Sequence, residues 1–413
     1  MAKSIVFCAD GTWNGPGDPP GSADIDGAVA QDADLNDNVT NVVNLFANLS
    51  GQITPQTQPL HNEPEKVFLD ASGAVLQISK YLHGVGDSNN LAVKVLGGVF
   101  GVGVITRIVR GYTFISRNYK PGDSIHIVGF SRGAYTARAL AGMIAKVGLL
   151  NPATFPADDK TQAYVRGFEA WMKSKEVSFS GIGKFGDLLT ALTVFADDVI
   201  TRIALKDSDF IPVRIQSVAV WDTVGAMGIP SYIQGRRRDL FSFVDTKLSP
   251  LVDHGFHAMA LDEERLDFPI TRWDQDSRIE QLWFVGAHSD VGGGYPAPAE
   301  SGLSDIALDW LMKKLAGAGV RFASPPQHAL DLTRFAQNYH EPWDKVPFNI
   351  GPQRRVPQKG DVFHPTVKQH WSASNSYQTR WPESLISGLP GAPSAPAAIS
   401  PGSTAPASTA PGK

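Results

Sequence analysis

A serine between two glycines is the first feature of this sequence that could carry out chemistry. Ser131 lies in Gly129-Phe130-Ser131-Arg132-Gly133, which matches the pattern Gly-x-Ser-x-Gly. In a nucleophile elbow, a sharp turn between a strand and a helix exposes the serine oxygen, and the glycines relieve crowding. A chain with 40 glycines easily produces the pattern by chance. The surroundings favour the functional interpretation, because Ser124–Gly129 is typical of a buried strand and Ala134–Val147 of a helix.

Two residues further along the chain could activate this serine. A serine hydroxyl is a poor nucleophile unless a histidine accepts its proton, and the histidine needs an acid that orients it and stabilises its charged form. In α/β-hydrolases the order along the chain is serine, acid, histidine. Asp222 follows the predicted strand Val213–Trp221, and His288 follows the predicted strand Ile279–Val285. We therefore predict a triad of Ser131, Asp222 and His288.

Other histidines and acids fit this order less well. His126 lies within a strand and is expected to be a buried, hydrogen-bonded core residue, and His254 and His257 are expected on a helix or loop. The remaining alternatives precede the serine, follow the last predicted strand, or lie in a helix-like segment or beside His288: His83, His328, His340, His364, His370, Asp262 and Asp290.

The tetrahedral intermediate of acyl transfer also needs donors for its oxyanion. One is usually the backbone N–H after the nucleophile, which here belongs to Arg132, and the other comes from a loop after an early strand. Asp10, Gly11 and Thr12 follow the predicted strand Ser4–Ala9, and Gly11 allows the backbone to approach a substrate closely. The alternative is a simple turn in which Asp10 caps the backbone.

The order of the predicted elements indicates an α/β fold. Four strands end in small or polar residues, and helices are expected between them, so we predict an α/β-hydrolase-like, mostly parallel sheet flanked by helices. Such sheets place functional groups at the carboxyl ends of their strands. The predicted strands are Ser4–Ala9, Ser124–Gly129, Val213–Trp221 and Ile279–Val285, and the predicted helices are Val39–Leu49, Ala134–Val147, Phe256–Glu264 and Ser304–Leu315.

Composition divides the chain into a catalytic domain and a tail. Residues 1–386 are expected to form the domain, with an inserted cap region at about 151–210, where the β/α rhythm is interrupted. Residues 387–413 are dominated by Pro, Ala, Ser and Gly, which predicts a disordered tail. The longest apolar stretch, Val95–Ile105, is too short to span a membrane. We expect a packed helix there, with an acyl pocket or a lipid contact as the alternative.

Charge and cysteine content exclude several classes of function. The net charge of −4 gives no indication of nucleic acid as a partner. A single cysteine, Cys8, excludes an intrachain disulfide framework and gives no support to a cysteine-based metal site. The run Asp262-Glu263-Glu264 is expected to be a solvated helix face rather than a cation site, so no metal or cofactor is predicted.

The first residues lack the features of a signal peptide, which predicts synthesis in the cytosol.

Several of these motifs together resemble a known family. They are Cys8–Asn14, Thr40–Val42, Gly84–Gly86, Gly129–Ala139, Trp221–Gly225, His257–Glu263 and Gly286–Tyr295. The combination is similar to the uncharacterised α/β-hydrolase family that includes the catalytic domain of type VI secretion phospholipase effectors. The resemblance covers roughly residues 3 to 320.

The resemblance implies a Ser131, Asp222 and His288 triad that acts on carboxylic esters, with glycerophospholipids as the best-known substrate class. It also implies peripheral membrane contact, secretion by a signal-independent type VI route, and a secretion-system partner or an immunity protein. Two alternatives stay open: an esterase of small soluble or sugar esters, and a catalytically silent binding module that keeps the fold.

Overall fold

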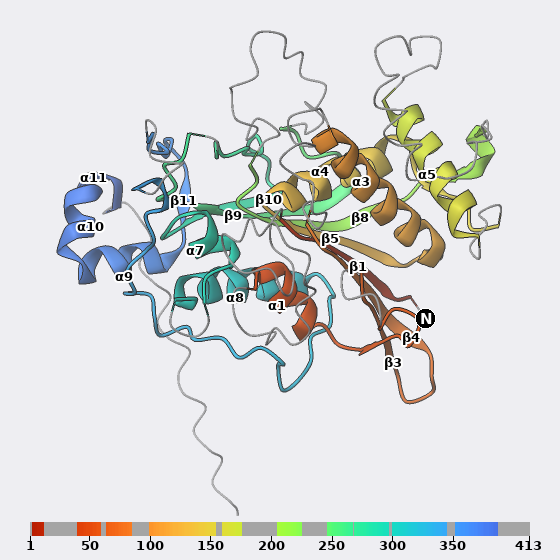
Figure 1. Cartoon of the computed structure of the whole chain (residues 1–413), viewed down its shortest axis with the longest axis horizontal. Helices are drawn as coiled ribbons and strands as arrows, with labels where there is room; N and C mark the ends of the chain where they lie inside the picture. Colours follow the sequence, from red (N-terminus) through yellow and green to blue (C-terminus); the bar gives the residue numbers. More distant parts are fainter. Residues whose placement is uncertain are drawn as a thin grey trace, which may run out of the picture.

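The computed structural model describes residues 2–11, 39–58, 63–84, 99–153, 159–175, 205–224, 246–266, 268–296, 300–344 and 352–386. In these residues helices lie on both faces of one twisted sheet (Figure 1). No helix in these ranges is long and apolar enough to cross a membrane.

The main sheet has nine strands in the order β11-β10-β9-β8-β5-β1-β4-β3-β2. From β4 to β11 neighbouring strands run parallel, whereas β3 and β2 are added antiparallel at one edge. The strands are β1 Ser4–Ala9, β2 Gln52–Ile53, β3 Glu65–Leu69, β4 Val75–Leu82, β5 Ser124–Phe130, β8 Ile215–Trp221, β9 Val252–Ala260, β10 Ile279–Phe284 and β11 Val362–Phe363. A separate two-stranded sheet is formed by β6 Leu149–Leu150 and β7 Phe210–Ile211, which pair antiparallel.

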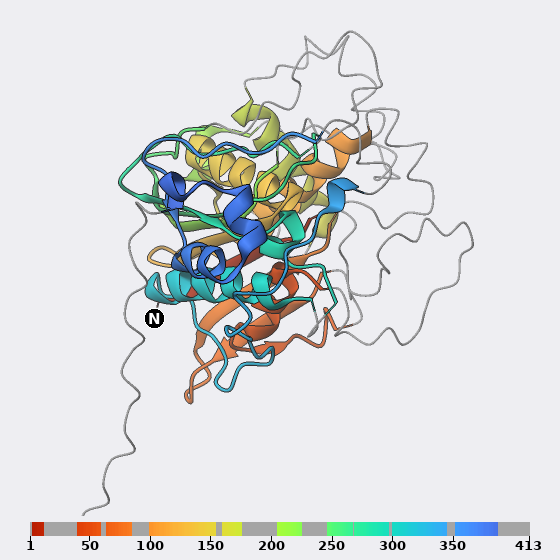
Figure 2. The ribbon, with the colours of Figure 1, turned by 90° about the vertical axis from the view of Figure 1, so that its left-hand side faces the viewer.

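The helices form one layer on each face of the sheet and a third group at its β11 edge (Figures 1 and 2). One layer contains α3 Val99–Asn118, α4 Arg132–Val147 and α5 Lys160–Ser174, and the other contains α1 Asn41–Asn48, α7 His288–Gly292 and α8 Gly302–Gly317. At the edge lie α9 Pro365–Ala373, α10 Asn375–Arg380 and α11 Glu383–Ile386. Two short 3₁₀ turns, η2 Asp207–Asp209 and η3 Pro342–Asp344, complete the described elements.

Strand β1 shows why the sheet is covered on both faces. Successive strand side chains point to opposite faces, and in β1 Ile5 and Phe7 belong to the core beneath α3 and α4, whereas Val6 and Cys8 belong to the core beneath α1 and α8. All six residues of the strand are buried. A third core holds the edge helices against β10 and β11 through Trp283, Phe363, Tyr377 and other residues.

The predicted fold class and most predicted elements are confirmed. The four strands and the helices at Val39–Leu49, Ala134–Val147 and Ser304–Leu315 are present within a few residues of the expected bounds, and the fold is the expected α/β-hydrolase-like one. Of the apolar stretch Val95–Ile105, the described part belongs to helix α3, which begins at Val99.

The helix predicted at Phe256–Glu264 is wrong, because most of this segment is strand β9 and His254 and His257 lie in it. A central parallel strand is buried on both faces and therefore lacks the alternation that identifies a strand. Strands β3 and β4 were also not predicted.

Two predictions about domain organisation concern residues that are largely outside the described ranges. Of the predicted cap region, helix α5 packs on α3 and α4, but residues 154–158 and 176–204 are not described. The predicted tail, 387–413, lies wholly outside. Both remain predictions.

Candidate active site

The nucleophile elbow is built at the carboxyl end of β5. Ser131 lies between the last residue of β5 and the first residue of α4, with φ 57° and ψ −122°. A positive φ is rare for a residue other than glycine and is concentrated at functional sites. The flanking glycines are required by space, because a Cβ on Gly129 would lie 2.3 Å from the Gly133 carbonyl oxygen and one on Gly133 would lie 2.2 Å from that of Ala9. The strand-to-helix turn predicted from the motif is therefore present.

Asp222 follows the neighbouring strand at the same edge of the sheet. The N–H of Ser131 donates to the carbonyl of Trp221, the last residue of β8, at 3.1 Å. Asp222 comes next, with φ 36°, and its N–H donates to the carbonyl of Ala258 in β9 at 2.7 Å. Ser131 and Asp222 are thus held at adjacent strand ends, as parallel sheets arrange functional groups.

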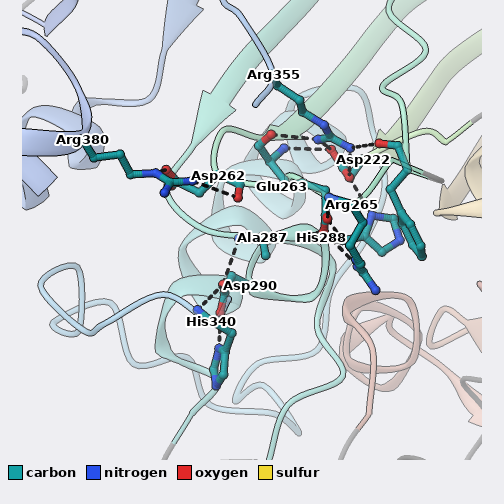
Figure 3. A network of polar contacts seen from close by, with 12 residues as sticks. Asp222, Asp262, Glu263, Arg265, Ala287, His288, Asp290, His340, Arg355 and Arg380 are labelled. Atoms are coloured by element: carbon teal, nitrogen blue, oxygen red, sulfur yellow. Dashed lines mark hydrogen bonds and ion pairs between the residues drawn. The ribbon is translucent and has the colours of Figure 1, made fainter. Parts of the chain in front are cut away.

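His288 is hydrogen-bonded to Asp222. Its Nδ1 lies 2.6 Å from Asp222 Oδ2, and both side chains are buried. The imidazole packs between two phenylalanines, with ring centroids 4.5 Å from Phe130 and 5.0 Å from Phe268. Because Phe130 directly precedes Ser131, this packing brings His288 to the elbow. The structure thus brings Asp222 and His288 into contact (Figure 3) and places the imidazole against the residue that precedes Ser131.

The site favours an ionised acid beside a neutral histidine. Burial alone would raise the pKa of Asp222, but the Arg355 guanidinium and the bond to His288 hold this pKa well below its usual range. Burial lowers the pKa of His288, and the attraction of Asp222 only partly opposes it. A neutral imidazole whose Nδ1–H donates to a carboxylate leaves Nε2 as a proton acceptor, which is what a general base requires.

Arg355 is a residue at this site that the sequence analysis missed. Its Nη1 and Nη2 lie 2.6 Å from Asp222 Oδ1 and 3.0 Å from Asp222 Oδ2 (Figure 3). The same two nitrogens donate to the carbonyls of Ala260 and Phe268. Arg355 lies in a segment without regular secondary structure, well beyond the last predicted strand, where nothing in the local pattern indicates proximity to Asp222.

The run Asp262-Glu263-Glu264 is a buried loop after β9, so its prediction as a solvated helix face is wrong. Glu263 accepts the His288 backbone N–H at 3.1 Å and pairs with Arg265. Asp262 accepts the Gly286 N–H and pairs with Arg380, which also pairs with Glu264. Buried carboxylates need such partners, and these partners connect the acidic loop to the turn that carries His288.

Asp10 and Gly11, the predicted oxyanion loop, lie beside the elbow at the end of β1. Asp10 is buried and accepts hydrogen bonds from Thr40, Tyr81 and the Gly11 N–H, the last at 2.7 Å. Burial raises the pKa of Asp10 to about 7, although these hydrogen bonds lower it. The Gly11 N–H thus donates to the Asp10 carboxylate in this structure, as in the alternative interpretation of a turn capped by Asp10. Arg132 is the first residue of α4, and Thr12 lies outside the described residues.

The competing histidines serve other contacts. His126 is buried, as predicted, but only its Nδ1 is hydrogen-bonded, to Ser217. His257 accepts the Thr223 N–H at Nε2, and burial lowers its pKa to about 3. His340 bridges Asp290 and Glu300. Within the described residues no group of three or more His, Cys, Asp or Glu side chains is arranged to hold a metal ion.

Comparison with protein families gives one match that spans most of the chain. Residues 3–314 match the family described as T6SS, phospholipase effector Tle1-like, catalytic domain. An uncharacterised protein of Saccharomyces cerevisiae, YEL023C, is 27% identical over 268 residues, which is 64% of this chain and 32% of that protein. This chain therefore spans about a third of the length of that curated relative.

Solved structures give weaker likenesses. The Tle1 effector bound to the VgrG spike of the type VI secretion system aligns with 73% of this chain and 53% of its own, at 19% identity and a TM-score of 0.39. An uncharacterised Pseudomonas aeruginosa protein aligns with 80% and 48%, at 16% identity and a TM-score of 0.38. Thermogutta terrifontis esterase 2, phosphoramylated by tabun, aligns with 77% and 84%, at 10% identity and a TM-score of 0.32.

Proposed function

The chain belongs to the family of T6SS phospholipase effector Tle1-like catalytic domains, and from that membership we propose that it is a serine hydrolase that cleaves carboxylic esters through an acyl-enzyme. The observation that carries the proposal is the buried Asp222–His288 pair beside Ser131, which has the backbone conformation of a nucleophile elbow. A silent binding module would not require a strained serine next to a histidine with a depressed pKa.

The reaction follows the roles that the residue types allow. His288 Nε2 accepts the proton of Ser131 Oγ while the oxygen attacks the ester carbonyl, and Asp222 stabilises the imidazolium. The Arg132 N–H and the loop of Asp10, Gly11 and Thr12 are the proposed donors to the oxyanion, for which the Gly11 N–H would exchange its hydrogen bond to the Asp10 carboxylate for one to the substrate. His288 then protonates the leaving alcohol, and water activated by the same histidine releases the acyl group. No metal or organic cofactor takes part in this sequence of steps.

Labelling with a fluorophosphonate tests the nucleophile. The probe should attach to Ser131, and Ser131→Ala should abolish both labelling and hydrolysis of a short nitrophenyl ester. Ser72→Ala is a matched control, because Ser72 lies in an exposed turn far from the elbow in the fold. Labelling of another residue, or an equal rate of hydrolysis for Ser131→Ala, would contradict the assignment.

We propose glycerophospholipids as the substrate class, because the family is described as phospholipase effectors. Phospholipid vesicles compared with short soluble esters separate this substrate from the alternative of small soluble or sugar esters. A lipid hydrolase should gain rate when its substrate aggregates. A higher kcat/KM for soluble esters, with no release of fatty acid from vesicles, would favour the alternative.

Delivery by a type VI secretion route, with a protein of the secretion system or an immunity protein as partner, is proposed on the same family membership. Co-purification of the chain with the spike protein of its own secretion system is the direct test. Absence of the chain from the medium of a secreting culture would count against this proposal without affecting the hydrolase assignment.

A further inference from the structure

We propose that Arg355 is a positioning residue for catalysis: it holds the triad acid Asp222 in place and keeps it ionised for His288. The inference rests on the proposed function and adds a fourth residue to the proposed triad. Within the described part of the chain Arg355 forms hydrogen bonds to Asp222 and to two backbone carbonyls but none to Ser131 or His288, so it acts through Asp222.

Four hydrogen bonds from three residues occupy both oxygens of the Asp222 carboxylate. Oδ1 accepts from the Ala260 N–H at 2.8 Å and from Arg355 Nη1, and Oδ2 accepts from His288 Nδ1 and Arg355 Nη2. Each carboxylate oxygen therefore has one Arg355 partner and one other partner. This leaves the carboxylate with one orientation, in which Oδ2 faces the imidazole.

Arg355 itself is held by the backbone. Besides the two bonds to Asp222, Nη1 donates to the Ala260 carbonyl at 2.8 Å and Nη2 to the Phe268 carbonyl at 2.7 Å. The side chain is buried, with 6% of its surface exposed. A planar guanidinium can make these four bonds at once, whereas a lysine ammonium offers three donors from a single atom.

Charge explains why an arginine is needed at this position. A buried carboxylate without a counter-charge becomes protonated at a higher pH, and a protonated acid would stabilise the imidazolium poorly. The other groups facing the pair offer little positive charge: Glu263 and Arg265 pair with each other, and burial lowers the pKa of His257 to about 3. Arg355 is the cation that directly contacts Asp222 among the described residues.

Arg355 lies outside the part of the chain that matches the family. The family match ends at residue 314, and the segment that carries Arg355 lies beyond it. The same segment is fixed to the loop of Asp262, Glu263 and Glu264, because the Gln353 N–H donates to the Glu264 carbonyl at 2.8 Å, whereas the half-exposed pair of Arg354 with Glu264 contributes little. A part of the chain outside the matched domain thus completes the site.

The test compares Arg355→Met, Arg355→Lys and the neighbouring control Arg354→Met. Arg354 is about half exposed and pairs with Glu264 rather than Asp222. Arg355→Met should lower kcat on a short ester about 100-fold with little change in KM. The acid limb of its kcat/KM profile should move to higher pH, because removal of a positive charge favours protonation of the pair. Arg355→Lys should retain the position of the limb with an intermediate kcat, and Arg354→Met should resemble the wild type.

A double variant separates positioning from a general structural role. Asp222→Asn should slow fluorophosphonate labelling far more than Arg355→Met does. The double variant Asp222→Asn with Arg355→Met should be labelled at a rate within about threefold of that of Asp222→Asn alone. The double variant should also melt at a higher temperature than Arg355→Met alone, because the latter leaves a buried carboxylate unpaired. The inference would be overturned if the double variant were slowed by the product of the two single-variant effects, or if the acid limb of the kcat/KM profile did not shift in Arg355→Met. A wild-type chain that is neither labelled nor active would instead overturn the proposed function.

Discussion

Asp222 is the residue on which the candidate site depends most. Its side chain is fully buried, and its four hydrogen bonds come from a backbone amide, a histidine and an arginine fork. Each bond favours the ionised carboxylate, and together they outweigh the cost of burial. The acid that the sequence analysis selected from its place after a strand is therefore also the acid with the environment that the chemistry requires.

The neutral state of His288 leads to a prediction about pH. Burial lowers the pKa of His288, so the free enzyme should keep its general base unprotonated at a pH where a free imidazole is already charged. The acid limb of kcat/KM for a short ester should have an apparent pKa below about 6.5. Circular dichroism over the same pH range verifies that the fold persists. An acid limb above that value would contradict the assignment.

At the scale of single residues, the sequence predicted those side chains whose position follows from a motif or a strand end. Ser131 and Asp222 come directly after a strand and His288 begins helix α7 a few residues after β10, and parallel strands bring their carboxyl ends together. Arg355 and Glu263 reach the site through loops, and the neighbours of a loop residue are fixed by tertiary packing rather than by local periodicity. No spacing rule could have found them.

The nucleophile elbow has no room for an added side-chain atom at Gly133. A Cβ on Gly133 would meet the carbonyl oxygens of Ala9 and Asp10 at 2.2 and 2.5 Å. Backbone atoms of a central strand cannot move aside, so Gly133→Ala should lower the free energy of unfolding by about 1–3 kcal/mol or more and slow fluorophosphonate labelling of Ser131. Urea denaturation measures the first effect.

Gly142 provides the control for this substitution because it lies in the same helix. A Cβ there has nothing within 4 Å. Gly142→Ala should stabilise the protein by up to about 1 kcal/mol, since alanine is the better helix former, and should leave labelling unchanged. Equal stability of the two variants would show that the close approach at Gly133 is not limiting.

The strands were predicted well where β-branched residues mark them and poorly elsewhere. Strands β1, β5 and β8 each contain two or three Ile or Val residues. In strand β9 only Val252 is β-branched, and its run of small and apolar residues fits a helix equally well. The nine-strand order could not be read from the sequence, since it depends on which strands cross over.

At the scale of the whole molecule, the edge helices α9 to α11 are attached through Asp262. This buried carboxylate accepts from Tyr377, Arg380 and Trp381 at 2.8, 3.0 and 2.8 Å, and from the Gly286 N–H at 2.7 Å. Gly286 lies two residues before His288. The attachment of these edge helices and the position of His288 therefore depend on the same side chain.

Arg380→Met should consequently destabilise the fold and reduce activity together. Removal of one partner of a buried ion pair costs about 3–5 kcal/mol, which a thermal melt would show as a fall of several degrees. Arg214→Met is the control, because its pair with Asp253 is exposed and should contribute about 1 kcal/mol or less. Equal melting temperatures for the two variants would contradict the structural role of Asp262.

The bond between Arg355 and Asp222 has a consequence for the order in which the protein is made. Translation proceeds from the N-terminus, and domains generally begin to fold while synthesis continues. The nucleophile, the acid and the histidine all leave the ribosome before Arg355 does. A nascent chain that already contains Ser131, Asp222 and His288 would still lack the counter-charge of Asp222, so full hydrolytic activity should arise only after the segment around residue 355 has been released.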